Sequence, residues 1–179
     1  MQISEHFRRM AENNLWANDR LHRAVLTLRP GEFDASRVGF FPSIRATLNH
    51  ILSVDLYYLD MLEEGGLGLG IFDRWVDFVD APSLAAAQID CDRRYLGFCA
   101  ALSDTDMDRR VESDRGEDGR IAERVGDLLA HIFQHDIHHR GQVHAMLSAT
   151  SVRPPQLDEY FLDFDLKLRR DEMRRLGLA

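Results

Sequence analysis

The chain has 179 residues, of which 45% are hydrophobic and 29% are charged, and its net charge is −8. This balance is typical of a single globular domain with a sizeable core, which we expect to span residues 1–179. The negative charge argues against nucleic acid as a partner, because phosphate backbones attract basic surfaces. No apolar run is long enough for a membrane span, and the first residues lack the apolar core of a signal peptide. We therefore expect no membrane partner and a cytoplasmic location.

Two long segments in the first third of the chain show the periodicity of amphipathic helices. The first is expected over residues 3–29, where apolar side chains recur every three or four positions until RPGEFD ends the pattern. The second is expected over residues 42–63, with Pro42 in its first turn and Ser43 placed to cap it. The glycine-rich stretch EEGGLGLG ends this second segment.

Two further helices are expected over residues 82–102 and 121–149, on the same evidence of period. Between them, residues 104–123 are polar and contain two glycines, so a small hairpin and an irregular loop are both compatible with the sequence. After a pair of prolines, an amphipathic pattern predicts a short helix around residues 157–175. The sequence thus predicts an all-α fold, an antiparallel four-helix bundle followed by a short C-terminal helix.

The stretch HIFQHDIHHRGQVHAMLS, in the fourth long segment, holds five of the eight histidines. On a helical wheel, His139 lies inside the apolar stripe of this segment and His135 lies at its edge, one turn away on the same side. The remaining three point away from the stripe, and a solvated helix face is the interpretation we favour for His131, His138 and His144.

Two histidines four residues apart on one helix face can bind a single metal ion. A hydrogen-bonded pair without metal is an equally good interpretation of that spacing alone. His50, in the middle of the second segment, lies beside an apolar stripe and by itself would be read as a structural residue. As a third ligand it would complete a site of imidazole nitrogens, which suit zinc, nickel, copper or iron.

Charged residues near these histidines also fall on the apolar stripes. Asp55 and Asp136 lie close to the stripe centres, and a buried carboxylate needs a partner. Each would either accept a ring N–H from a ligand histidine or pair with Arg45, Arg140 or a side chain of the first helix. We slightly favour the second, structural interpretation. Arg140 itself would bind an anionic group of a substrate or, as we favour, form an inter-helix salt bridge.

Three other residues are expected to serve packing. Trp16 and Asn18 on the first segment should lie in the core, with hydrogen bonding near the histidines as the alternative for Asn18. Gly141 is expected to permit the close approach of another helix. The sequence has no serine-elbow motif, no GxGxxG pattern and no P-loop, which removes several rival mechanisms.

Several stretches resemble the DinB-like family, which includes bacillithiol- and mycothiol-dependent enzymes. They are NNLWANDRL, LNHILSVD, QHDIHHRGQVHAML and PPQLDEYF, and they cover nearly the whole chain; HDIHHRGQ is the most specific. The resemblance implies a four-helix bundle with one long crossover, usually a homodimer. It also implies a metal site made of one histidine on the second helix and two on the fourth. Carried onto this sequence, the implied ligands are His50, His135 and His139.

The function that the resemblance favours is metal-dependent transfer of a low-molecular-weight thiol to a small electrophile. The metal, with nickel or zinc as the leading identities, would leave a coordination position open and hold the sulfur as thiolate. Two alternatives stay open: a hydrolase that uses metal-bound hydroxide, and a stress-associated bundle that binds a metal or ligand without turnover. The resemblance does not identify a catalytic residue beyond the metal ligands, the thiol or the electrophile.

Overall fold

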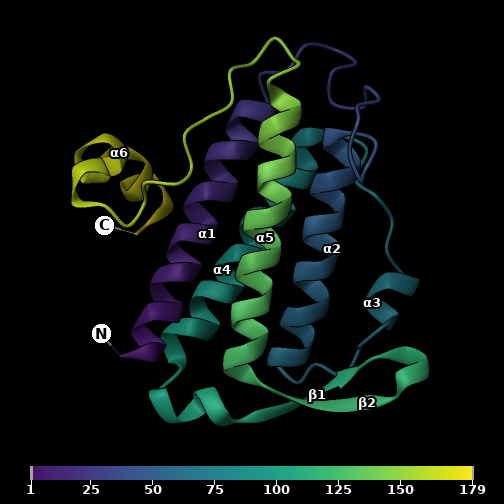
Figure 1. Cartoon of the computed structure of the whole chain (residues 1–179), viewed down its shortest axis with the longest axis vertical. Helices are drawn as coiled ribbons and strands as arrows, with labels where there is room; N and C mark the ends of the chain where they lie inside the picture. The colour runs from purple at the N-terminus through teal and green to yellow at the C-terminus, as the bar shows by residue number, and fades with distance from the viewer. Residues whose placement is uncertain (1, 179) are drawn as a thin grey trace.

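A computed structural model describes residues 2–178 of the chain, and its long elements are helices (Figure 1). Four of them pack side by side, with α5 between α1 and α2 and with α4 behind. The all-α fold class is therefore confirmed, with one small hairpin added. The elements are α1 (Ile3–Val25), α2 (Ile44–Leu62), α3 (Gly70–Asp73), α4 (Ala81–Ala101), β1 (Arg110–Asp114), β2 (Arg120–Arg124), α5 (Val125–Leu147) and α6 (Leu166–Leu176).

A long crossover between α2 and α4 sets the direction of the helices. In Figure 1, α1 and α5 run upward, whereas α2 and α4 both run downward, so residues 63–80 must return along the length of the bundle. The simple antiparallel arrangement expected from periodicity is wrong in this respect, and the crossover implied by the family resemblance is present. As a result α2 and α5 lie antiparallel and in contact, which brings the middle of one helix against the middle of the other.

Side-chain caps fix where two of these helices begin. The hydroxyl of Ser43 accepts a hydrogen bond from the backbone N–H of Ala46, so α2 begins one residue later and Pro42 lies outside it. At the C-terminal end of the crossover, the Asp80 carboxylate accepts a hydrogen bond from the N–H of Ser83, and α4 begins at residue 81. This second cap fixes the point where the crossover joins α4.

The hairpin resolves the alternative left open for residues 104–123, and it shortens the predicted fourth helix. Strands β1 and β2 pair antiparallel, with Val111 opposite Glu123, and Gly119 turns the chain at a φ of +79° that favours glycine. Helix α5 therefore begins at Val125, four residues later than expected. Ile121, at the start of the predicted helix, belongs to the strand β2 and is 43% exposed.

The predicted C-terminal helix is also shorter than expected, because residues 157–162 form no helix. This segment instead packs along α1: Tyr160 is buried against Trp16, with ring centroids 5.3 Å apart. Trp16 also donates a hydrogen bond from Nε1 to Glu172 of α6 at 2.7 Å. A small second core, separate from the main one, joins α1 to the C-terminal segment through Leu15, Trp16, Ala17, Tyr160 and Leu176.

The main core fills the space between the four long helices and carries the side chains that the periodicity predicted. Leu48 and Ile51 of α2 are buried, as are Leu128, Leu129 and Ile132 of α5. Within residues 2–178, no helix combines the length and the apolar character that crossing a bilayer requires.

Candidate metal centre

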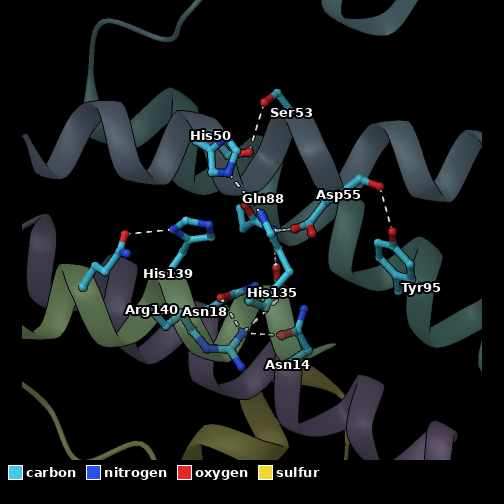
Figure 2. Close-up of polar contacts among 12 residues, drawn as sticks. Asn14, Asn18, His50, Ser53, Asp55, Gln88, Tyr95, His135, His139 and Arg140 are labelled. Atoms are coloured by element: carbon cyan, nitrogen blue, oxygen red, sulfur yellow. Dashed lines mark hydrogen bonds and ion pairs between the residues drawn. The ribbon is translucent and has the colours of Figure 1, made fainter. Parts of the chain in front are cut away.

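Three histidine rings converge where the middle of α2 faces the middle of α5 (Figure 2). His135 and His139 lie one turn apart on α5, and His50 faces them from α2. The Nε2 atoms of His50 and His135 are 3.0 Å apart, and one ring nitrogen from each of the three residues lies within 4.8 Å of the others. The structure therefore brings together the three residues that the sequence singled out as metal ligands.

Burial favours the neutral form of two of these imidazoles, those of His50 and His139. Desolvation, followed by the neighbouring His135 and His139, lowers the pKa of His50 to about 4. Burial likewise lowers the pKa of His139, which is only 8% exposed, although its bond to Gln142 acts in the opposite direction. Because a neutral imidazole is the form that binds a metal, His50 remains competent at pH 7 and well below it, and the lowered pKa of His139 acts in the same direction.

The three rings fit a metal ion in distance and in chemistry. Ring nitrogens bound to one ion lie about 2.0–2.1 Å from it, so any two of them are at most about 4 Å apart. The nitrogens of His50 and His135 already meet that condition, and a ring nitrogen of His139 lies within 4.8 Å of both residues' ligand atoms. Neutral nitrogen donors suit a divalent transition ion, and they leave its charge uncompensated.

Gln142 fixes the ring orientation of His139. Its side-chain oxygen Oε1 lies 2.8 Å from Nδ1 of His139, and an amide oxygen can only accept, so Nδ1 carries the proton and Nε2 presents its lone pair. The amide nitrogen of Gln142 then donates to Nε2 of His138 at 3.0 Å. Sequence reasoning missed this role; the only signal was that Gln142 follows His139 by three residues and His138 by four.

A buried polar network lies directly behind His135. Asp136 is fully buried, with one oxygen 3.6 Å from Nδ1 of His135 and the other 3.7 Å from Nη1 of Arg140. Both distances are those of ion pairs rather than hydrogen bonds. Asp136 thus lies near both partners considered for it, the ring of a proposed ligand histidine and the guanidinium of Arg140. Arg45 forms an ion pair with Asp34 instead, so it is not the partner of either buried aspartate.

Arg140 ties this network to α1. Its Nη1 donates to the side-chain oxygens of Asn14 and, at 3.0 Å, of Asn18. Asn18 also donates to Asp92 of α4 at 3.0 Å, so the alternative considered for it, hydrogen bonding near the histidines, is the one observed. The predicted inter-helix salt bridge of Arg140 is replaced by these hydrogen bonds and by an ion pair within α5. Figure 2 shows Arg140 between α5 and α1 with both asparagines beside it.

Asp55 extends the network to α2 and α4. It is fully buried, accepts a hydrogen bond from Gln88 at 2.7 Å, and lies within 4.8 Å of the ligand atoms of His135 and Asp136. Burial, together with Asp136 and Asp92, holds the pKa of Asp55 well above its ordinary value, and burial raises that of Asp92 to about 7. All four long helices contribute to this network, which fixes the rotation of α5 and so directs its two histidines toward α2.

An aromatic loop just before α2 covers the histidines. The ring of Phe41 lies 4.3 Å from that of His50 and 5.6 Å from that of His139, centroid to centroid. Phe40 packs edge-on against Phe41 and is itself 84% exposed. The nearby Val38 is fully exposed. The histidine cluster therefore has an apolar wall, which no periodic pattern in the sequence could have indicated.

The other three histidines of α5 lie outside the cluster. His131 is exposed, with its ring 4.9 Å from that of Tyr58, and His138 is exposed beside Gln142. These two fit the solvated face that we favoured. His144 differs, because it is half-buried and its Nε2 lies 3.0 Å from the carbonyl oxygen of Pro155 in the C-terminal segment.

Comparison with known proteins supports this arrangement at the level of the family. A model described as the DinB family matches residues 1–167. The chain belongs to the DinB family. It is 22% identical over 150 residues to Protein DinB of Bacillus subtilis (strain 168), an alignment that covers 81% of this chain and 86% of the relative. The resemblance inferred from the sequence motifs is thereby confirmed.

The fold has a counterpart among solved structures. The crystal structure of a DinB-like protein from Bacillus subtilis superposes with a TM-score of 0.57 at 14% identity, covering 78% of this chain and 90% of the other. At that identity the likeness extends to the fold alone. DinB family membership therefore accounts for the bundle, and the chemistry of the three histidines has to be argued from this chain.

Proposed function

We propose that this DinB family protein is a metal-dependent thiol S-transferase that acts on a small electrophile. The observation that carries the proposal is the convergence of three histidines, His50, His135 and His139, whose ligand atoms lie within 4.8 Å of one another. Sites with three protein ligands leave a coordination position open, which is the pattern of catalytic rather than structural metal sites.

The three histidines would hold a divalent transition ion, for which nickel and zinc are the leading identities. When bound, the ion would act as a Lewis acid and lower the pKa of a thiol at its open position into the neutral range. In the overall reaction the thiol gives its proton to solvent, its sulfur forms a bond to the electrophilic carbon, and the displaced group leaves with the electron pair of the bond that breaks.

The chain itself supplies orientation and shielding. Gln142 holds His139 with Nε2 toward the cluster, and Asp136 lies beside the outer nitrogen of His135. Phe41 and the exposed Phe40 form an apolar wall against which the body of a small organic electrophile can pack, which also limits access of water. These features favour an apolar electrophile over a highly charged one.

Three further expectations belong to this proposal. The cosubstrate would be a low-molecular-weight thiol, and the setting would be the cytoplasm, where such thiols are kept reduced. Neither nucleic acid nor membrane would take part, in keeping with the net charge of −8. The working form would be a homodimer, which the family resemblance implies and sedimentation can test.

The test begins with elemental analysis of the purified protein, followed by turnover of a generic aromatic halide with glutathione, bacillithiol, mycothiol and coenzyme A. We expect about one metal ion per chain, from its single triad, and turnover that needs both metal and thiol. Consumption of the substrate without thiol would indicate a hydrolase instead of a transferase. If the metal-loaded protein shows no rate above background, a binding function without turnover is indicated.

A variant pair separates a functional His50 from a structural one. His50→Ala should abolish turnover while leaving the thermal unfolding transition nearly in place, because the side chain is only half-buried on a long helix. His138→Ala, on the exposed face of α5, is the control and should retain both metal and turnover. A fall in melting temperature for His50→Ala, with no metal-linked activity to lose, would contradict the proposal.

A further inference from the structure

An open groove of about 870 Å³ lies on the side of α5 that faces away from the histidine cluster. Ile137, Gly141 and His144 line it, and on a helix these positions are roughly 140–240° around the axis from His135 and His139. Its other walls are α1 and the irregular segment that precedes α6. The groove is thus separated from the proposed metal site by the body of α5.

The lining is largely apolar and comes from three directions. Met10 of α1 and Ile137 of α5 face the segment that carries the two prolines, and the far wall is closed by Leu157, Tyr160 and Phe161. Ile137 and Phe161 remain 52% and 42% exposed. Pockets of about 300–1,000 Å³ with mainly apolar walls and a few polar groups are typical of small-molecule sites.

Asn13 presents a side-chain amide to the groove. It is only 7% exposed, it lines the groove, and among residues 2–178 its side chain has no hydrogen-bond partner, unlike Asn14 and Asn18 on the same helix. An amide that faces the groove and has no partner within the chain can both donate to and accept from a bound molecule.

Arg153 adds a positive charge at the rim. It lines the groove and is exposed, and within the described part of the chain its guanidinium forms neither an ion pair nor a hydrogen bond. The opposing charge, Asp158, accepts a hydrogen bond from Gln156. The third charged residue, Arg140, is already engaged by Asp136 and by two asparagines. An uncommitted cation at the mouth of an apolar groove is complementary to an anionic group on an apolar body.

From these contacts we propose that the groove between α1, α5 and residues 153–161 is a second ligand site, which binds a small amphipathic anion. Its apolar body lies between Ile137 and Phe161, its carboxylate or sulfonate meets Arg153, and a polar atom of the ligand pairs with Asn13. The C-terminal segment is held in place for this by the hydrogen bond between His144 and the Pro155 carbonyl. The site needs no metal and is independent of the transferase proposal.

Gly141 offers a way to close the groove without disturbing the fold. A Cβ added there would meet nothing within 4 Å, so a larger side chain can extend into the open space. Gly141→Leu should therefore fill the groove while the helix is kept, and its metal content should match that of the wild type. Arg153→Gln removes the rim charge, and Arg93→Gln, on the exposed face of α4, removes an equal charge elsewhere and serves as its control.

The probes are anilinonaphthalene sulfonate, which is anionic, and phenylnaphthylamine, which is its neutral counterpart, each titrated by fluorescence. We expect saturable binding of both, weakened at least about tenfold by Gly141→Leu, since the body of either probe needs the groove. Arg153→Gln should weaken the sulfonate alone, by about two- to fivefold as for an exposed ion pair. Arg93→Gln and removal of metal by a chelator should change neither.

Several results would overturn the proposal. Binding that survives Gly141→Leu would place the probes elsewhere, and equal effects of the two arginine variants would remove the specific role of Arg153. If probe binding grows on dilution in step with dissociation of a dimer measured by sedimentation, the occupant of the groove is a second copy of the chain rather than a small anion.

Discussion

The two sides of α5 are built in different ways, although they belong to the same helix. On the side of His135 and His139, Arg140 bonds to Asn18 of α1, Asn18 bonds to α4, and Asp55 of α2 lies within 4.8 Å of Asp136. On the side of Gly141, an irregular segment stands off the helix and leaves a groove. The first side is over-determined, as a site that must hold ring nitrogens in place requires. The second is open and adaptable, which suits a ligand with few directional contacts.

The largest expected effect compares two adjacent histidines that face different directions. His139→Ala removes a proposed ligand. Loss of a residue that only hydrogen-bonds to a ligand costs up to about 100-fold in metal affinity, so loss of the ligand itself should cost more than that. His138→Ala removes an exposed ring and should change metal affinity by less than about threefold, which is below the roughly 10-fold loss expected for a residue that hydrogen-bonds to a ligand. Competition titration with a chromophoric chelator measures both. Equal losses would mean that the direction assigned to the α5 side chains is wrong.

A smaller but still large effect is expected at Gln142. Gln142→Leu leaves the Nδ1 proton of His139 without an acceptor and frees the ring to rotate, so metal affinity should fall by about 10–100-fold. Gln142→Glu keeps an acceptor for that proton and should restore most of the affinity. If the leucine and glutamate variants bind metal equally well, the amide has no orienting role.

Protons should compete with the metal only at a low pH. The pKa of His50 is lowered from its ordinary value to about 4, and that of His139 is also lowered. A lowered pKa preserves the neutral, ligand-competent form of these two histidines as the pH falls through 6.5, and for His50 this form is lost only as the pH approaches 4. Affinity measured at pH 7.5, 6, 5 and 4.5 should therefore reach half of its full value at a pH below 6.5. Half-loss close to pH 6.5 would show that burial does not protect the triad.

Only the regular parts of the site could be predicted from the sequence. His135 and His139 were separated from their neighbours by helical period alone, because one buried face repeats regularly along α5. His50 required the family resemblance, since one histidine beside a stripe carries no periodic signal. Phe41 and the groove could not be foreseen, because both depend on irregular segments whose position is set by packing against helices distant in the sequence.

The expectation for Gly141 was wrong for the same reason, because it too depends on an irregular segment. A glycine inside a helix suggested that another helix approaches closely, yet a Cβ at this position meets no atom within 4 Å. That expectation was wrong because the neighbour on this side is not a helix but the segment around Pro154 and Pro155, which stands away from α5. The fourth helix was also extended wrongly into β2, because this strand ends at Arg124 and α5 begins at the next residue with no loop between them.

The smallest expected effect tests the open side directly. Gly141→Ala removes the backbone freedom of glycine in a helix interior and meets no steric obstacle, so the free energy of unfolding should rise by about 1 kcal/mol. For a chain of this size that corresponds to about 2–4 °C in melting temperature. Metal affinity should stay unchanged, because the added methyl group lies on the side of α5 away from the histidines, and calorimetry with a chelator titration measures both. A lower melting temperature would mean that the C-terminal segment closes onto α5 in solution, and a change in metal affinity would show that the two sides of the helix are coupled.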